Sequence, residues 1–202
     1  MTFLELCRRV REESAVTTAG PDTVIGQRDM LAKIVNWVRA ADYEIQCKFC
    51  DWSFLWSELQ SSLTAGNSAL VISDCKALDV LEVATAPLTE LDHHVLRRLS
   101  ASGSQGRPTN YAVAPDGDIT LYPKPDAAYP CYASYYRKPT TLALDGDVSA
   151  IPAEFHMIIV YRALAMLATS EQDQAMLSRS EYEYELMLQA LANRCRPTLR
   201  VF

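Results

Sequence analysis

The most hydrophobic stretch of the sequence covers residues 151–168, where apolar side chains fall on nearly every side of a helix. A helix that is apolar all round is normally buried within a core rather than laid against its surface. Pro152 suits the first turn of such a helix, and Glu154 suits the positive end of its dipole. We therefore predict a central helix here, with Phe155 and Ile159 among the residues that organise the core. His156 is expected to be a helix-start residue with a local hydrogen bond.

Three other segments show the three-and-four spacing of amphipathic helices. Residues 2–15 begin with Thr2 and Glu5 in the capping-box arrangement. Helices are also predicted over residues 27–49 and 170–193. The aromatic segment 51–56, which follows the second helix, is predicted to be a turn or short helix. Its residues Trp52 and Trp56 are expected to fill the same core.

The middle of the chain changes to short runs that are typical of β-strands. The turn Pro115-Asp116-Gly117 predicts a hairpin, because its glycine can adopt the positive φ that such a turn requires. A short helix is predicted at 87–99, and a third strand follows the hairpin to complete a small antiparallel meander. The predicted strands are 69–72, 80–84, 110–114, 118–122 and 132–137.

Together these elements predict an α+β fold, a bundle of about four to five helices with an inserted β meander. We expect one domain at residues 1–193, with residues 1–60 and 151–193 forming the bundle and residues 67–139 forming the β-rich insertion. Residues 194–202 are predicted to be an extended C-terminal tail, since Pro197 prevents the last helix from continuing.

Composition narrows the function classes. The 202 residues are 49% hydrophobic and carry 25 acidic and 19 basic side chains, a formal net charge of −6. This balance argues against a protein that holds nucleic acid through a broad basic face. Charged residues interrupt the stretch 151–168, and the start of the chain lacks a signal-peptide pattern, so we expect folding in the cytoplasm, no membrane segment and six free cysteines.

Few residues suggest a catalytic, redox or metal-binding site. Cys47 and Cys50 have the C-x₂-C spacing of zinc and redox sites, and four other residues could complete a metal site: Cys75, His93, His94 and Cys131. No second pair has the required spacing, and the helix end explains the two cysteines as small apolar residues. No nucleophile elbow, phosphate loop or zinc-protease motif is present. We therefore predict neither an enzyme nor a cofactor or metal, and a metal-dependent hydrolase remains a minor alternative.

Six tyrosines crowd into the predicted β-rich segment, where they suggest a second function. Aromatic strands can stack the bases of single-stranded nucleic acid, so such a binding module is the main alternative function. Few basic residues accompany the tyrosines, which favours a role in the meander or in a protein interface. The six are Tyr111, Tyr122, Tyr129, Tyr132, Tyr135 and Tyr136.

The tail is the strongest candidate for a partner-binding segment. Arginine and apolar residues alternate there in a stretch too short to bury itself, which favours docking on a partner. A frayed terminus is the alternative interpretation. The residues concerned are Arg194, Arg196, Leu199, Arg200, Val201 and Phe202.

Several short motifs follow one another in a particular order. They are D-W-S-F-L-W at 51–56, G-R-P-T-N-Y at 106–111, I-T-L-Y-P-K-P-D at 119–126, Y-Y-R-K-P at 135–139 and I-P-A-E-F-H at 151–156. This order resembles the adaptor, or head-to-tail connector, proteins of tailed bacteriophages. The resemblance covers residues 2–191, and the tail has no counterpart in it.

The resemblance implies a structural virion protein that is neither an enzyme nor dependent on a cofactor. It implies a homo-oligomeric ring, typically twelvefold, that sits beneath the portal protein and presents a platform to the next tail or neck component. DNA would pass through the lumen without specific binding when the genome is ejected. The expected location is the neck of the virion, after synthesis in the host cytoplasm. We expect the bundle to supply lateral contacts and the tail to dock on the portal or on a neighbouring subunit.

Overall fold

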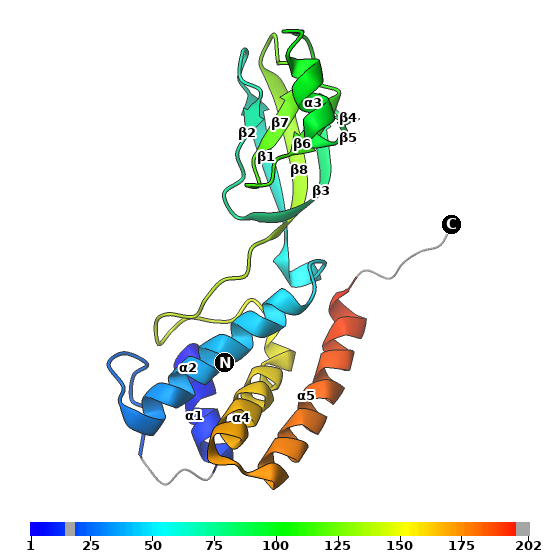
Figure 1. The fold of residues 1–202 in the computed structure, drawn as a ribbon. Coiled ribbons are helices and arrows are strands. Elements are labelled where there is room, and N and C mark those ends of the chain that lie inside the picture. The colour runs from blue at the N-terminus through cyan, green and yellow to red at the C-terminus, as the bar shows by residue number, and fades with distance from the viewer. Residues whose placement is uncertain (15–18, 197–202) are drawn as a thin grey trace. The chain divides into compact units, whose positions relative to one another are not determined.

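Long helices and strands separate into two units in the computed structural model, which describes residues 1–14 and 19–196. The helical unit combines Met1–Phe54 with the chain from Pro139 onward, and the β unit is Leu55–Lys138 (Figure 1). The β unit is thus inserted between two parts of the helical unit. This arrangement confirms the predicted α+β class, in which an antiparallel β segment interrupts a helical bundle.

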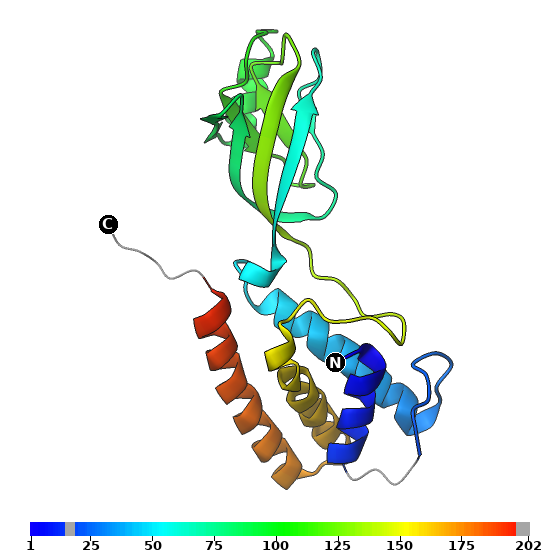
Figure 2. The same ribbon diagram turned by 180° about the vertical axis from the view of Figure 1, so that it is seen from behind.

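Helix α4 (Met157–Glu171) is the centre of the helical unit. It packs against α5 (Gln174–Cys195), α2 (Asp29–Lys48) and α1 (Phe3–Glu13), and both views place it between α5 and the other two helices (Figures 1 and 2). The predicted central helix is therefore confirmed, although it begins only after the 3₁₀ turn Ala153–Phe155. Its buried residues point in every direction: Ile158, Ile159, Val160, Ala163, Leu164, Ala165, Leu167 and Ala168.

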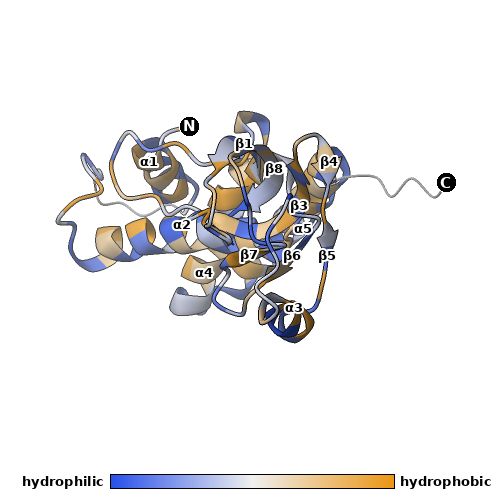
Figure 3. Cartoon of the chain, turned by 90° about the horizontal axis from the view of Figure 1, so that it is seen from above, coloured by the Kyte–Doolittle hydropathy of each residue, from blue (hydrophilic) through white to orange (hydrophobic). Residues whose placement is uncertain are grey.

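Helices α1 and α2 bury one face each, and their ribbons alternate between hydrophobic and hydrophilic residues (Figure 3). The predicted capping box of α1 is present: the backbone N–H of Glu5 donates to Thr2 Oγ1 at 3.3 Å, and the N–H of Thr2 donates to Glu5 Oε2 at 2.9 Å. These bonds satisfy two N–H groups that a helix start leaves without an intrahelical partner.

Helix α5 begins after a tight turn and ends later than the sequence predicts. Gln172 adopts the left-handed conformation with φ of 58°, and the side chain of Asp173 accepts from the backbone N–H of Met176 at 2.9 Å. Arg194 and Cys195 are helical, so they do not belong to an extended tail. The helix persists because the buried side chain of Cys195 continues its apolar face by one turn. Residues 197–202 lie outside the described residues.

The β unit consists of two four-stranded sheets. The first has the order β1 (Trp56–Leu63), β8 (Tyr129–Arg137), β3 (Cys75–Val83), β4 (Ala86–Pro87) and is antiparallel throughout. The second has the order β2 (Ala69–Leu70), β7 (Ile119–Tyr122), β6 (Asn110–Val113), β5 (Thr89–Glu90), in which only β5 and β6 are parallel. Residues of both sheets share one core: Leu63, Leu70, Leu81, Val83, Tyr111, Ile119, Leu121, Cys131 and Ala133.

The β unit differs from the prediction in several details: for example, β2 ends two residues before the predicted strand 69–72, and β3 begins five residues before the predicted strand 80–84. Strand β1 was not predicted, because its sequence W-S-E-L-Q-S-S-L is mostly polar and only its backbone pairing with β8 makes it a strand. The hairpin of β6 and β7 is confirmed, but β8 lies between β1 and β3 in the other sheet. The predicted helix at 87–99 is helical only in α3 (His93–Ser100), because the Asp92 side chain caps it there through the backbone N–H groups of His94 and Val95.

Candidate functional site

The C-terminal end of α5 is fastened to the segment that follows α2. Arg196 donates from Nε to Asp51 Oδ1 and from Nη2 to Asp51 Oδ2, both at 3.0 Å, and its guanidinium carbon lies 4.2 Å from the centre of the Phe49 ring. We call Phe49, Asp51 and Arg196 the C-terminal clamp. A planar guanidinium that binds both carboxylate oxygens and also stacks on a ring is held in one orientation. The clamp therefore determines where the chain leaves the helical unit towards residue 197.

Electrostatics support this arrangement. The hydrogen bonds from Arg196 lower the pKa of the Asp51 carboxyl, and the same bonds raise the pKa of Arg196. An acid whose pKa is lowered on folding stabilises the protein above its unfolded pKa, and this contribution disappears as the pH falls through the folded pKa. The clamp should therefore be formed at neutral pH and weaken in acid.

We expect Arg196→Ala to shift the denaturation midpoint to lower denaturant concentration at pH 7, because the ion pair is partly solvated but bidentate. The measurement is chemical denaturation followed at 222 nm. Arg194→Ala is the matched control, since the contact of Arg194 with Glu154 is loose at 3.9 Å and both side chains are exposed. The difference between wild type and Arg196→Ala should shrink below about pH 4. Equal losses for the two variants would contradict a specific role for the clamp.

The structure describes only two of the six predicted tail residues. Arg194 lies on the exposed side of α5 and Arg196 lies in the clamp, so the two side chains have different surroundings. The other four lie outside the described residues: Leu199, Arg200, Val201 and Phe202.

The four residues predicted to organise the core differ in how deeply they are buried. Trp52 and Ile159 are completely buried in the helical unit, and Phe155 is half-buried. The expectation for Trp56 is wrong, because it starts strand β1 and its side chain is 42% exposed. Trp52 is held by its indole N–H, which donates to the carbonyl of Ile45 at 3.0 Å, and by ring contacts with Phe49 and Phe54.

The cysteines and histidines are dispersed. Cys47 and Cys50 are exposed in the helical unit, whereas the four residues considered as partners belong to the β unit: Cys75, His93, His94 and Cys131. Among residues 1–14 and 19–196, no group of three or more His, Cys, Asp or Glu side chains could hold a metal ion. His156 is buried, and its Nε2 lies 2.8 Å from the carbonyl oxygen of Ile151, which confirms the predicted local hydrogen bond. Burial lowers the pKa of His156.

The tyrosines of the β unit pair with carboxylates. Their hydroxyl groups donate to acidic side chains in four cases: Tyr111 to Glu90 at 3.5 Å, Tyr129 to Asp126 at 2.7 Å, Tyr132 to Glu58 at 2.8 Å and Tyr135 to Asp74 at 3.1 Å. These contacts raise the pKa of Tyr129 and Tyr132. Negative charge beside the rings repels phosphate groups, so this arrangement disfavours the nucleic-acid-binding alternative.

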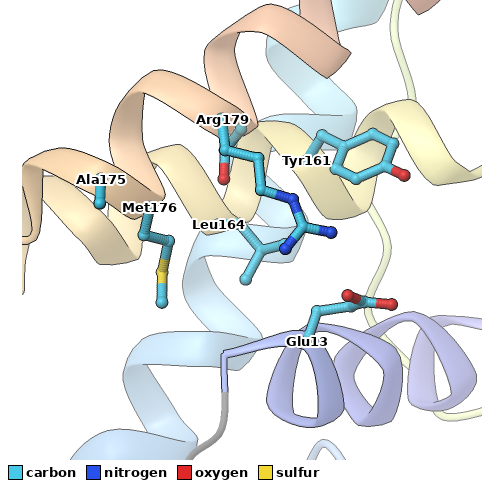
Figure 4. A pocket seen from close by; sticks show the side chains of 7 residues that line it. Glu13, Tyr161, Leu164, Ala175, Met176 and Arg179 are labelled. Atoms are coloured by element: carbon cyan, nitrogen blue, oxygen red, sulfur yellow. The ribbon is translucent and has the colours of Figure 1, made fainter.

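A hollow of about 240 Å³ lies where α1, α4 and α5 meet (Figure 4). Arg179 reaches across it towards Glu13, while Tyr161, Leu164 and Met176 form its walls. Glu13 already forms an ion pair with Arg9 at 2.7 Å. Among these lining residues no nucleophile is paired with a base, and the hollow is smaller than the usual ligand pocket of about 300–1,000 Å³.

A buried polar network in the helical unit was not predicted. Asp42 accepts a short hydrogen bond from the Ser149 hydroxyl and a second from Gln46 Nε2 at 2.8 Å. Gln46 also binds the backbone of Thr140 through both ends of its amide, each at 3.1 Å. The network therefore holds the returning chain, residues 140–149, against α2. Burial raises the pKa of Asp42 to about 6.

Comparison with known families decides between the alternatives. The family model described as SU10 adaptor protein matches residues 1–200, nearly the whole chain. The chain belongs to this family of tailed-phage head-to-tail adaptors. No curated protein matches the sequence significantly. The adaptor is thus a structural phage protein of the virion neck, where portal and tail components meet. In the described part of this adaptor, no helix is long and apolar enough to cross a membrane.

Proposed function

We propose that copies of this adaptor form a ring beneath the portal, extend the DNA channel and provide the platform for tail attachment. The family match over residues 1–200 is the observation that carries this proposal. The net charge of −6 supports it, because an acidic channel wall repels the phosphate backbone and lets DNA slide. A closed ring of identical copies requires two different contact surfaces on each chain.

Residues 197–202 are, in this proposal, the segment that docks on the portal or on a neighbouring subunit. The sequence T-L-R-V-F after Pro197 offers alternating apolar and basic side chains, which suit the edge of a partner sheet or an apolar groove. The C-terminal clamp supports this role because it gives the segment a defined starting point. A defined starting point lowers the entropy that docking must overcome.

Removal of residues 197–202 is expected to reduce retention of the adaptor on portal-containing heads by about tenfold or more. This truncation leaves the clamp and α5 intact, so circular dichroism should be unchanged. Copies per head are counted by mass measurement of purified particles. The full-length variant Thr198→Ser is the matched control and should bind like wild type.

Two outcomes would count against these assignments. Retention of the truncated chain at the wild-type level would remove the docking role of residues 197–202. Failure of the wild-type chain itself to assemble on portal-containing heads would overturn the adaptor proposal as a whole.

A further inference from the structure

One edge of the first sheet of the β unit is long and open to a further strand. In the order β1-β8-β3-β4, β1 is the outermost strand, cyan in Figure 2, and within residues 1–14 and 19–196 it pairs with β8 alone. The other three edges of the two sheets are formed by β2, β4 and β5, which have two residues each. Strand β1 has eight residues and is therefore the long edge of the β unit. We call its side away from β8 the β1 edge.

The features that normally protect an edge strand are missing from β1. Its sequence W-S-E-L-Q-S-S-L contains neither proline nor lysine, and its pairing with β8 runs without a bulge from Trp56 to Leu63. A regular edge of this kind presents alternate backbone N–H and C=O groups to another strand. Most of its side chains are exposed: Trp56, Glu58, Gln60, Ser61 and Ser62.

The two faces of β1 differ in chemistry. Leu59 and Leu63 lie on the inner face and pack with the core that both sheets share. Because side chains alternate along a strand, Trp56, Glu58 and Gln60 lie together on the outer face. The indole of Trp56 is 42% exposed there, although it offers a large apolar surface. A strand added at the β1 edge should therefore be apolar on one face and carry an aromatic side chain on the other.

The outer face is acidic beside the β1 edge. Glu58 accepts from the hydroxyl of Tyr132 at 2.8 Å, and among the described residues no lysine or arginine forms an ion pair with it. The hydrogen bond to Glu58 raises the pKa of Tyr132, and the carboxylates of Glu82 and Asp79 on β3 raise it further. Three carboxylates thus lie close to this hydroxyl. A partner strand with a basic side chain on its outer face would be complementary in charge.

Residues 197–202, P-T-L-R-V-F, have the matching pattern, and we call them the C-terminal segment. In an extended chain Leu199 and Val201 would point to one side, while Thr198, Arg200 and Phe202 would point to the other. Arg200 is the one charged side chain of the segment, as Glu58 is of β1. Six extended residues span about 20 Å, which is enough to pair with most of β1.

An antiparallel register matches four pairs of side chains across the two strands. When the arginine lies opposite the glutamate, the aromatic, polar and apolar residues on either side also meet their own kind. The pairs are Arg200 with Glu58, Phe202 with Trp56, Thr198 with Gln60 and Leu199 with Leu59. A parallel alignment with the same ion pair would place Phe202 beside Gln60 and would leave Trp56 beside Thr198. The antiparallel register therefore fits better.

We propose that the C-terminal segment of one copy adds to the β1 edge of the next copy as an antiparallel strand. This inference rests on the proposed ring and deepens it, because the segment and the β1 edge are the two unlike surfaces that closed head-to-tail association requires. Each copy donates one strand and accepts one. The C-terminal clamp holds the residue from which the donated strand begins.

The direct test replaces Phe202 by the photoreactive residue benzoylphenylalanine in the full chain. A mixture of equal amounts of ¹⁵N-labelled and unlabelled copies is assembled on portal-containing heads and illuminated. Mass spectrometry should find cross-links from position 202 to residues 54–58, and about half of them should join a labelled to an unlabelled chain. The same probe in place of the exposed Tyr182 of α5 is the control and should not react with residues 54–58. Cross-links confined to one chain, to other segments, or to the portal or a tail protein would overturn the inference.

A charge exchange gives an independent readout. Arg200→Glu and Glu58→Lys should each reduce the number of copies per head by about fivefold, because each brings like charges together. The double variant Arg200→Glu/Glu58→Lys restores an opposite pair and should assemble nearly like wild type. Glu82→Lys is the matched control, since it makes the same charge change on the same face but two strands away. It should not rescue Arg200→Glu.

Recovery in the double variant would also show that the single variants are folded. A double variant that assembles no better than the single variants would overturn the inference. Single variants with the wild-type number of copies would do the same, while the adaptor function would stand. Heads without any ring of the wild-type chain would overturn both.

Discussion

Replacing Trp52 by alanine is expected to lower the free energy of unfolding of the helical unit by about 3–5 kcal/mol. The indole is completely buried and contacts the rings of Phe49 and Phe54, so its removal leaves a large cavity and no new contact replaces those that are lost. It also leaves the carbonyl of Ile45 without its side-chain donor. Chemical denaturation followed at 222 nm measures this loss, because the long helices dominate that signal.

Trp56→Ala is the matched control for this experiment. The same aromatic residue is removed four positions later, but Trp56 is 42% exposed in strand β1 and belongs to the β unit. We expect a loss of about 1 kcal/mol or less. Similar losses for both variants would show that Trp52 does not anchor the helical unit.

The second large effect concerns the buried carboxyl of Asp42. Its pKa is raised to about 6 because burial disfavours the charged form more than the bonds from Ser149 and Gln46 favour it. The folded protein therefore holds this proton over a pH range in which the unfolded chain has released it. The contribution of Asp42 to stability should fall as the pH rises from about 4 to about 6, by about 3 kcal/mol in total.

Asp42→Asn isolates this contribution because an amide does not titrate. We expect the stability of wild type relative to Asp42→Asn to fall across this pH range and to stay constant above pH 7. Asp147→Asn should show the opposite trend, since backbone N–H groups lower the pKa of Asp147. A difference between wild type and Asp42→Asn that does not change with pH would refute the assignment. Asp42→Ala should lose about 2–4 kcal/mol, because the Ser149 hydroxyl loses its buried acceptor.

The sequence predicted an element correctly where its hydrophobic pattern or its local turn and cap residues determine the structure. Helix α4 was predictable because a helix that is apolar all round has few alternatives to a central position. The cap of α1 and the β6–β7 hairpin were predictable because local chemistry determines them. Strand β1 was not, since its side chains are polar and its partner β8 lies more than sixty residues away in the sequence.

The same limit applies to the candidate site. The motif D-W-S-F-L-W contains two tryptophans, and the sequence alone does not reveal that the chain passes from one unit to the other between them. Asp42 and Gln46 occur beside core positions of α2, which was a detectable signal, but their partners Ser149 and Thr140 are too distant in the sequence to be recognised. Asp145 accepts hydrogen bonds from Thr23 and Val24, which belong to a loop whose proximity only the fold establishes.

The chain enters the β unit through β1 and leaves it through β8. The first residue of β1, Trp56, pairs with Tyr136 near the end of β8. The two chain ends of this insertion are therefore neighbours, so a short peptide bridge in its place would leave the helical unit topologically complete. Recombination between related viruses could therefore exchange one such insertion for another without changes in the helical unit.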